Sequence, residues 1–201
     1  MASVTSATPQ RDVVLRYTNG AILLHWLMAL LVLVQVGIGV TFKYLPRGAL
    51  HTELFLWHKT LGALILLFAI IRLVWRLIHR PPPFPDDLPR WERIVSVWTH
   101  RAFYALLILL PLTGLVAVSD HARGGLTPLQ FGLSMPVVPG VSEATGELSG
   151  DVHIALVVIT VLLLVLHVGA ALRNQIQRKR VAGRMPPFTP PAGAEVQEDE
   201  G

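Results

Sequence analysis

The sequence predicts an all-α integral membrane protein built as a four-helix bundle, and three observations support this prediction. Of its 201 residues, 52% are apolar and only 15% are charged, whereas a soluble domain carries about 25% charged residues. The mean hydropathy is +0.54. The chain also has four long apolar runs, each close to the roughly 20 residues that cross a hydrocarbon core. Together these features argue against a soluble enzyme and against a disordered scaffold.

The apolar runs predict four transmembrane spans, at about residues 20–41, 54–78, 97–118 and 152–173. The second run contains Lys59, Arg72 and Arg76, but these lie near its ends, where long basic side chains reach the membrane interface. The first run is longer than the apolar region of a signal peptide, so we expect it to be retained. The spans define one membrane domain of residues 16–184, between a flexible N-terminal segment (1–15) and a disordered tail (185–201).

Basic residues are distributed unevenly among the connections. Most of the 17 Lys and Arg residues lie before the first span, between the second and third spans, and after the fourth. Positively charged connections stay on the cytoplasmic side, so both termini are predicted to be cytoplasmic. The same distribution along three juxtamembrane edges argues against a nucleic-acid-binding groove.

Four of the eight histidines lie inside the predicted spans, namely His25, His58, His153 and His167, and the chain has no cysteine. His153 and His167 are 14 residues apart, which places them on nearly the same face of one helix, about 21 Å apart along its axis. His58 lies at the depth of His153, and His25 at the depth of His167. Two imidazoles facing each other at equal depth can hold haem iron from both sides, so the two layers predict two b-type haems in the bundle core.

Histidines inside membrane spans can also be neutral imidazoles that bond to a neighbouring helix, or ligands of a bare metal ion, which the absence of carboxylates in the spans disfavours. Iron with histidine on both axial sides has no open position, so such haems transfer electrons rather than activate oxygen. Glycines near these depths, Gly39, Gly62 and Gly169, would leave room for a flat macrocycle or let helices approach closely. Arg72 falls at the depth of the inner layer, where it would pair with a haem propionate or anchor the helix at the interface.

Several motifs together resemble the prokaryotic cytochrome b561 family. The similarity covers roughly residues 16–187 and rests on five stretches in order: Leu24-His25-Trp26, Trp57-His58-Lys59-Thr60-Leu61-Gly62, Leu110-Pro111-Leu112-Thr113-Gly114, Gln130-Phe131-Gly132-Leu133 and Leu166-His167-Val168-Gly169-Ala170-Ala171-Leu172-Arg173. The resemblance implies a multi-pass protein of the bacterial inner membrane. It also implies two haem b groups, with His25 and His167 as axial ligands on the cytoplasmic side and His58 and His153 on the periplasmic side.

Members of this family pass electrons between a periplasmic partner and the quinone pool, and some oxidise superoxide and reduce ubiquinone. The resemblance therefore implies a superoxide:quinone oxidoreductase. Lys59, Arg47 and Lys43 are candidates for attracting the superoxide anion, although Lys59 also fits an interfacial lysine. His100 and Asn174 are candidates for binding quinone and supplying protons, and His100 also fits an interfacial position at a helix start. Relatives often carry histidine where this chain has Asn174 and Gln175, which is a departure from the family pattern.

Two alternatives stay open. In the first, the chain is a di-haem membrane anchor for a periplasmic redox partner and has no superoxide activity of its own; its long connection at residues 120–151 is then the docking surface. In the second, the chain is a small transporter or assembly factor whose histidines carry protons or metal.

Overall fold

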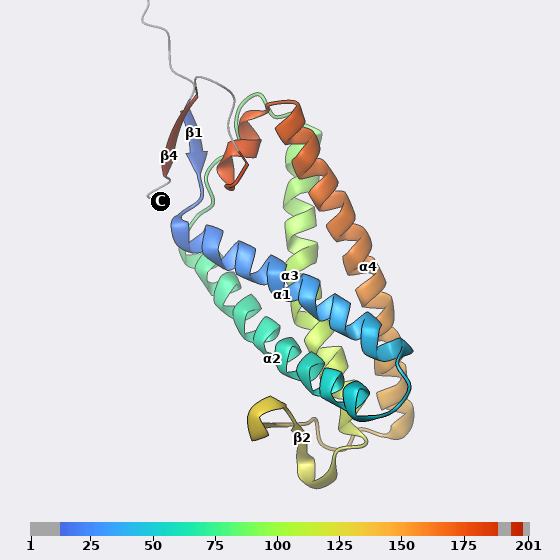
Figure 1. Cartoon of the computed structure of the whole chain (residues 1–201). Helices are drawn as coiled ribbons and strands as arrows, with labels where there is room; N and C mark the ends of the chain where they lie inside the picture. The colour runs from blue at the N-terminus through green and yellow to red at the C-terminus, as the bar shows by residue number, and fades with distance from the viewer. Residues whose placement is uncertain (1–12, 189–193, 199–201) are drawn as a thin grey trace, which may run out of the picture.

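The computed structural model describes residues 13–188 and 194–198. Four long helices form its body, and each is long and apolar enough to cross a membrane. They are α1 (Asn19–Tyr44), α2 (Ala49–Ile78), α3 (Arg90–Ser119) and α4 (Glu143–Ile176). This arrangement confirms the predicted all-α membrane bundle (Figure 1). Each helix extends beyond its predicted span, because its first or last turns continue into the more polar connections.

Local sequence signals explain where the helices begin. Thr18 precedes α1, and its hydroxyl accepts a hydrogen bond from the backbone N–H of Ala21. Ser142 caps α4 in the same way through the N–H of Thr145, with Glu143 in the first turn, where a negative charge complements the helix dipole. Pro111 lies inside α3, where it removes one backbone hydrogen bond of the helix.

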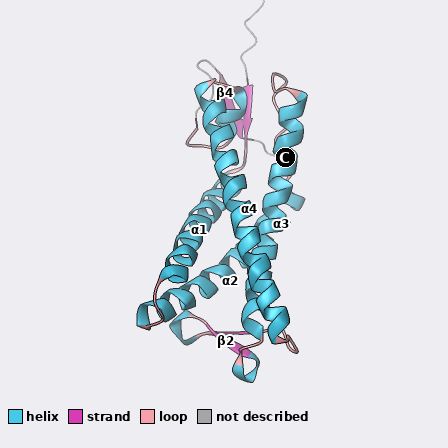
Figure 2. Ribbon diagram, turned by 90° about the vertical axis from the view of Figure 1, so that its right-hand side faces the viewer, coloured by secondary structure: helices cyan, strands magenta, loops and turns pink. Residues whose placement is uncertain are grey.

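The helices pack as two pairs, α1 with α2 and α3 with α4, and α2 also packs against α3 (Figures 1 and 2). Among the described residues, Met28, Ile65 and Ala69 form a small buried core. Many large apolar side chains point outward instead, as expected where lipid rather than water surrounds the helices.

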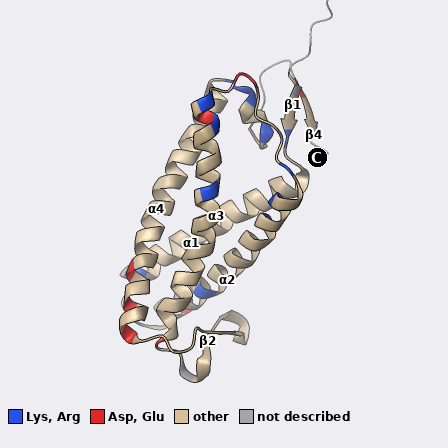
Figure 3. Ribbon diagram, turned by 180° about the vertical axis from the view of Figure 1, so that it is seen from behind, with Lys and Arg blue, Asp and Glu red and all other residues tan. Residues whose placement is uncertain are grey.

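Charged side chains differ between the two ends of the bundle. Lys and Arg gather where α4 ends and α3 begins, whereas the acidic residues at the start of α4 lie at the opposite end (Figure 3). We call these the basic end and the loop end. The loop end carries the short elements η1 (Arg123–Gly125), β2 (Leu126–Pro128), η2 (Gln130–Gly132) and β3 (Ser134–Pro136), of which β2 and β3 form an antiparallel pair.

Two short strands at the basic end join the described ends of the chain. β1 (Val13–Arg16) and β4 (Glu195–Glu198) pair in parallel. Arg16 forms an ion pair of 3.1 Å with Glu198, which also accepts a hydrogen bond of 3.0 Å from the N–H of Asn19. The sequence predicts a flexible segment at 1–15 and a disordered tail at 185–201, and both stay predictions. The two strands lie partly or wholly within these segments, while the parts at 1–12, 189–193 and 199–201 lie outside the described residues.

Residues 180–188 fold back against the basic end. Within them, η3 (Arg180–Arg184) ends in a buried arginine, only 4% exposed. Its guanidinium lies 5.3 Å from the ring centre of Tyr17 and 5.1 Å from that of Phe84, and it donates to the carbonyl of Pro82. The indole N–H of Trp26 donates to the carbonyl of Pro186. This segment therefore closes one side of the bundle at the basic end.

Candidate functional site: two pairs of histidines

The structure brings the four predicted histidines together as two pairs. The outer pair, near the loop end, is His58 on α2 and His153 on α4, with ring centres 6.2 Å apart. The inner pair, near the basic end, is His25 on α1 and His167 on α4, with ring centres 6.4 Å apart. Midway between the histidines of α4 lies Thr160, 2% exposed, whose hydroxyl bonds to the carbonyl of Leu156 within the same helix.

The separation of the paired rings suits a metal ion held between them. Two imidazoles that bind one metal ion from opposite sides have ring centres about 6 Å apart, because each metal–nitrogen bond is about 2 Å long and each ring adds about 1 Å. Within the described residues, no three His, Cys, Asp or Glu side chains form a group that would hold a bare ion. The donor set therefore fits iron whose remaining four ligands come from a porphyrin.

One histidine of the outer pair, His153, already has the protonation pattern that such binding requires. Nδ1 of His153 lies 2.9 Å from the carbonyl of Leu110 on α3, so it must donate a proton to that oxygen. Its Nε2 is then the nitrogen with a free lone pair in the neutral ring. Within the described residues, Nδ1 of His58 is buried without a hydrogen-bond partner.

The inner pair is arranged differently. Arg72, on α2, donates from Nη2 to Nδ1 of His25 over 3.1 Å. That bond puts the proton of a neutral His25 on Nε2, so binding of a metal ion through Nε2 requires Arg72 to leave Nδ1. His167 packs edge-on against Phe103 and against His100, whose ring centre is 5.7 Å away. Arg72 thus lies beside the inner pair, and its role as a propionate partner stays a prediction.

A cavity of about 420 Å³ opens from the inner pair toward the basic end. Both residues proposed from the sequence for quinone binding, His100 and Asn174, line it. Nδ1 of His100 donates to the carbonyl of Ser96 over 2.6 Å. Oδ1 of Asn174 is buried and has no hydrogen-bond partner in the part of the chain that the structure describes. Glu92 lies on the cavity wall, where Lys179 donates to its carboxylate over 2.7 Å.

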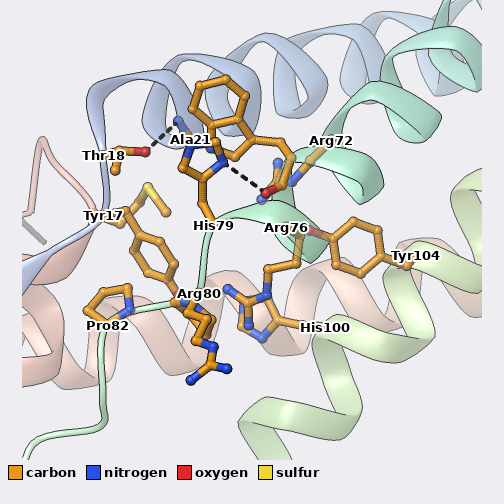
Figure 4. A pocket seen from close by; sticks show the side chains of 13 residues that line it. Tyr17, Thr18, Ala21, Arg72, Arg76, His79, Arg80, Pro82, His100 and Tyr104 are labelled. Carbon is orange, nitrogen blue, oxygen red and sulfur yellow. Dashed lines mark hydrogen bonds between the residues drawn. The ribbon is translucent and has the colours of Figure 1, made fainter. Parts of the chain in front are cut away.

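A smaller crevice of about 50 Å³ adjoins this cavity and shares His100 with it (Figure 4). Arg72, Arg76 and Arg80 approach it from the last turns of α2 and the residues just beyond, and His79 stacks on Trp75 with ring centres 4.2 Å apart. Its lining residues include no Asp or Glu. This crevice is therefore strongly basic.

The basic residues predicted to attract superoxide lie at the loop end. Nζ of Lys59 donates to the hydroxyl of Thr127 in β2 over 2.9 Å, so this lysine binds the outer loop to α2 next to His58. Lys43, in the last turn of α1, and Arg47, in the turn that follows, are both exposed. A second bond, from the N–H of Gln130 to the hydroxyl of Thr60, fixes the same loop.

The three glycines near the histidine depths have different neighbours. A Cβ on Gly39 would lie 3.0 Å from Cε1 of His58, so this glycine makes room for an imidazole. A Cβ on Gly62 would meet the side chain of Gln35, and one on Gly169 would meet nothing within 4 Å. Sequence reasoning missed Gly114, which lies against His153. Its position in the stretch Leu110-Pro111-Leu112-Thr113-Gly114 was the available signal.

Comparison with known proteins agrees with this geometry. The sequence model of a family described as prokaryotic cytochrome b561 matches residues 16–187. Cytochrome b561 homolog 2 of Escherichia coli (strain K12) is 31% identical over 156 residues, which cover 75% of this chain and 79% of the relative. The range matched by the family model contains the four helices and all four paired histidines.

Proposed function

Because the chain belongs to the prokaryotic cytochrome b561 family, a family of b-type haem proteins that transfer electrons across the bacterial inner membrane, we propose that it carries electrons from periplasmic superoxide to ubiquinone through two haems. The observation that supports this most directly is the presence of two facing histidine pairs at two depths of one bundle. One-electron transfer is the chemistry that such haems supply when bound.

The four histidines would hold two haems, one between each pair. His58 and His153 would hold the haem on the periplasmic side, and His25 and His167 the one on the cytoplasmic side. Arg72 would leave Nδ1 of His25 and pair with a propionate, a role supported by its place beside the inner pair. The concentration of Lys and Arg at the basic end favours a cytoplasmic location for that end.

Oxidation of superoxide at the outer face requires little of the protein. The anion loses one electron and becomes oxygen, with no bond broken and no proton moved. Lys59 supplies a positive charge next to His58, and Thr127 holds its ammonium group in place. Lys43 and Arg47 add positive charge at the same end, which raises the local concentration of an anion.

Reduction of ubiquinone requires two electrons and two protons, so its site must combine hydrogen-bond donors with access to water. The cavity at the inner pair offers both. Asn174 presents a buried amide whose oxygen has no partner, and its NH₂ group donates to a quinone carbonyl. His100 keeps Nδ1 bonded to Ser96, which leaves Nε2 to exchange a proton at the cavity.

The test uses purified protein in detergent and its reduced-minus-oxidised absorption spectrum. We expect b-type bands with two haems per chain, and reduction by a superoxide-generating system that superoxide dismutase abolishes. Addition of a short-chain ubiquinone should then reoxidise the haems. A protein without b-type bands would refute the proposal as a whole, and haems that superoxide leaves oxidised would refute the choice of electron donor.

A second candidate function is a membrane anchor that accepts electrons from a periplasmic redox protein. The outer loop favours it, because Phe131 is 78% exposed and Leu133 is 59% exposed, both next to α2 at the loop end. The two functions differ in one measurement. Fast haem reduction by superoxide in the absence of any partner supports the enzyme, whereas reduction only after a periplasmic extract is added supports the anchor.

A further inference from the structure

Each imidazole of the outer pair rests against a glycine of a neighbouring helix. A Cβ on Gly39 of α1 would lie 3.0 Å from Cε1 and 3.4 Å from Nδ1 of His58. A Cβ on Gly114 of α3 would lie 3.2 Å from Cε1 and 3.3 Å from Nδ1 of His153. In both cases the glycine faces the same edge of the ring. These approaches are closer than ordinary van der Waals contacts of a side-chain carbon, so any larger residue would displace the ring.

Each glycine also follows a particular backbone carbonyl by one helical turn. Leu110 precedes Gly114 by four residues, and its carbonyl accepts the proton of His153 Nδ1 over 2.9 Å. Gln35 precedes Gly39 by four residues, but among the described residues Nδ1 of His58 has no hydrogen-bond partner. The side chain of Gln35 donates instead from Nε2 to the backbone carbonyl of His58 over 2.9 Å. Each outer histidine thus lies against a glycine of a different helix, and His153 also bonds to the carbonyl one turn before that glycine.

Helix geometry explains why glycine is needed four residues after the carbonyl. In an α-helix the carbonyl of residue i bonds to the N–H of residue i+4, which uses only one of its two lone pairs. The Cβ of residue i+4 leans back toward the N-terminus, over that carbonyl. When residue i+4 is glycine, the second lone pair is open to a donor from a neighbouring helix. In this way His153 on α4 reaches the carbonyl of Leu110 on α3.

We propose that Gly39 and Gly114 are positioning residues for the outer pair, because each leaves room for the imidazole that faces it. Gly114 also uncovers the carbonyl of Leu110, which accepts the proton of His153 Nδ1 and leaves Nε2 free to bind iron. This inference rests on the proposed haem-binding function. It extends that function by naming residues outside the ligand set that place the two rings and, at His153, fix which ring nitrogen is available.

The inner pair lacks this arrangement. Nδ1 of His25 receives a hydrogen bond from Arg72 instead of donating to a carbonyl. Gly169, two residues after His167, would place a Cβ near nothing within 4 Å. The proposal therefore predicts that substitutions at Gly39 and Gly114 affect the outer haem and not the inner one.

Thr113 adds a further contact to one of the two rings. Its hydroxyl lies 3.2 Å from Nδ1 of His153 and donates to the carbonyl of Leu110 over 3.0 Å. The hydroxyl of Thr113 thus contacts both the carbonyl of Leu110 and the imidazole of His153, which the absence of a side chain at Gly114 allows to meet. Replacing Thr113 by valine removes the hydroxyl while the size of the side chain changes little.

The experiment compares Gly39→Ala and Gly114→Ala with the unchanged protein by haem titration, redox titration and the electron paramagnetic resonance spectrum of the ferric haems. Alanine favours the helix over glycine, so neither variant should unfold. We expect the haem affinity of the outer site to fall about 10- to 100-fold, the effect typical of losing a partner of a metal-binding histidine. We expect the resonance signal of the outer ferric haem to shift and that of the inner ferric haem to stay unchanged. Thr113→Val should cause a smaller change at the same haem.

Gly37→Ala and Gly150→Ala are the matched controls, because a Cβ at Gly37 meets nothing within 4 Å and one at Gly150 meets only Ala117, at 3.9 Å. Changes in the test variants no larger than in these controls overturn the inference. His58→Ala and His153→Ala separate it from the proposed function. If both lose one haem while the glycine variants match the controls, only the inference fails; if both keep two haems, the ligand assignment itself fails.

Discussion

Replacing Arg72 by glutamine should lower the midpoint potential of the inner haem and leave that of the outer haem nearly unchanged. Arg72 lies beside His25 in the structure, and a guanidinium that moves from Nδ1 to a propionate would keep its charge within about 10 Å of the inner iron. At an effective dielectric constant of about 20, a unit charge at this distance contributes about 2 kcal/mol. For a one-electron couple this energy corresponds to about 100 mV. A positive charge stabilises the reduced haem, so removing it should lower the potential by up to this amount.

The assay is a redox titration followed by the absorption of the two haems, with Arg72→Lys as a control that keeps the charge. A propionate paired with Arg72 would offset part of its charge, so we expect a decrease between about 50 and 100 mV in Arg72→Gln. The lysine variant should retain most of the original potential. An unchanged inner potential in the glutamine variant, or a larger change at the outer haem, would refute the reasoning.

Three further outcomes follow from the structure. His167→Ala should lose the inner haem and keep the outer one, measured as one haem per chain, because the paired rings lie in separate layers. Lys59→Gln should slow haem reduction by superoxide several-fold, with a weaker dependence of the rate on salt, because a positive charge next to His58 is removed. Met28→Ala should lower the unfolding temperature in detergent, because removing a buried core side chain costs about 2–5 kcal/mol; it should not change the number of bound haems.

The depth of the four paired histidines in the bundle could be predicted from the sequence. The rotation of each helix about its own axis, which decides what each histidine faces, could not. The spacing of 14 residues between His153 and His167 fixes their height in the bundle and their common face. Their partners then follow from the spans in which they lie. The structure accordingly brings His58 to His153 and His25 to His167.

The contacts around those rings depend on which neighbouring helix faces them. The depth of Gly39 in the membrane follows from the sequence. Depth alone does not show whether this glycine lies next to an imidazole or next to a macrocycle. Gly114 lies on the helix without a paired histidine, so depth matching within the histidine-bearing spans could not select it. The sequence indicates a charge at Lys59 that attracts an anion, but its bond to Thr127 comes from a loop 68 residues later in the chain, whose path no local pattern specifies.

The pairing of β1 with β4 escapes sequence reasoning for a related cause. Glu198 lies in an acidic stretch that by composition indicates a solvated tail, yet Arg16 and the N–H of Asn19 bind its carboxylate. Complementary charges at opposite ends of a chain carry no periodic signal. They matter only once the helices have brought the two ends to the same side of the bundle.

The different surroundings of the two histidine pairs indicate a direction for electron flow. At the outer pair, Nδ1 of His153 donates to a carbonyl, which makes the ring a stronger ligand and stabilises the oxidised haem. At the inner pair, Arg72 lies beside His25, and its positive charge would stabilise the reduced haem. The positive charge of Lys59 would raise the potential of the outer haem only weakly, because its ammonium group points to Thr127 in the outer loop. The outer haem should therefore have the lower potential, so that electrons move spontaneously toward the basic end. Redox titration of variants that retain a single haem tests this order, and an inner haem of lower potential would contradict it.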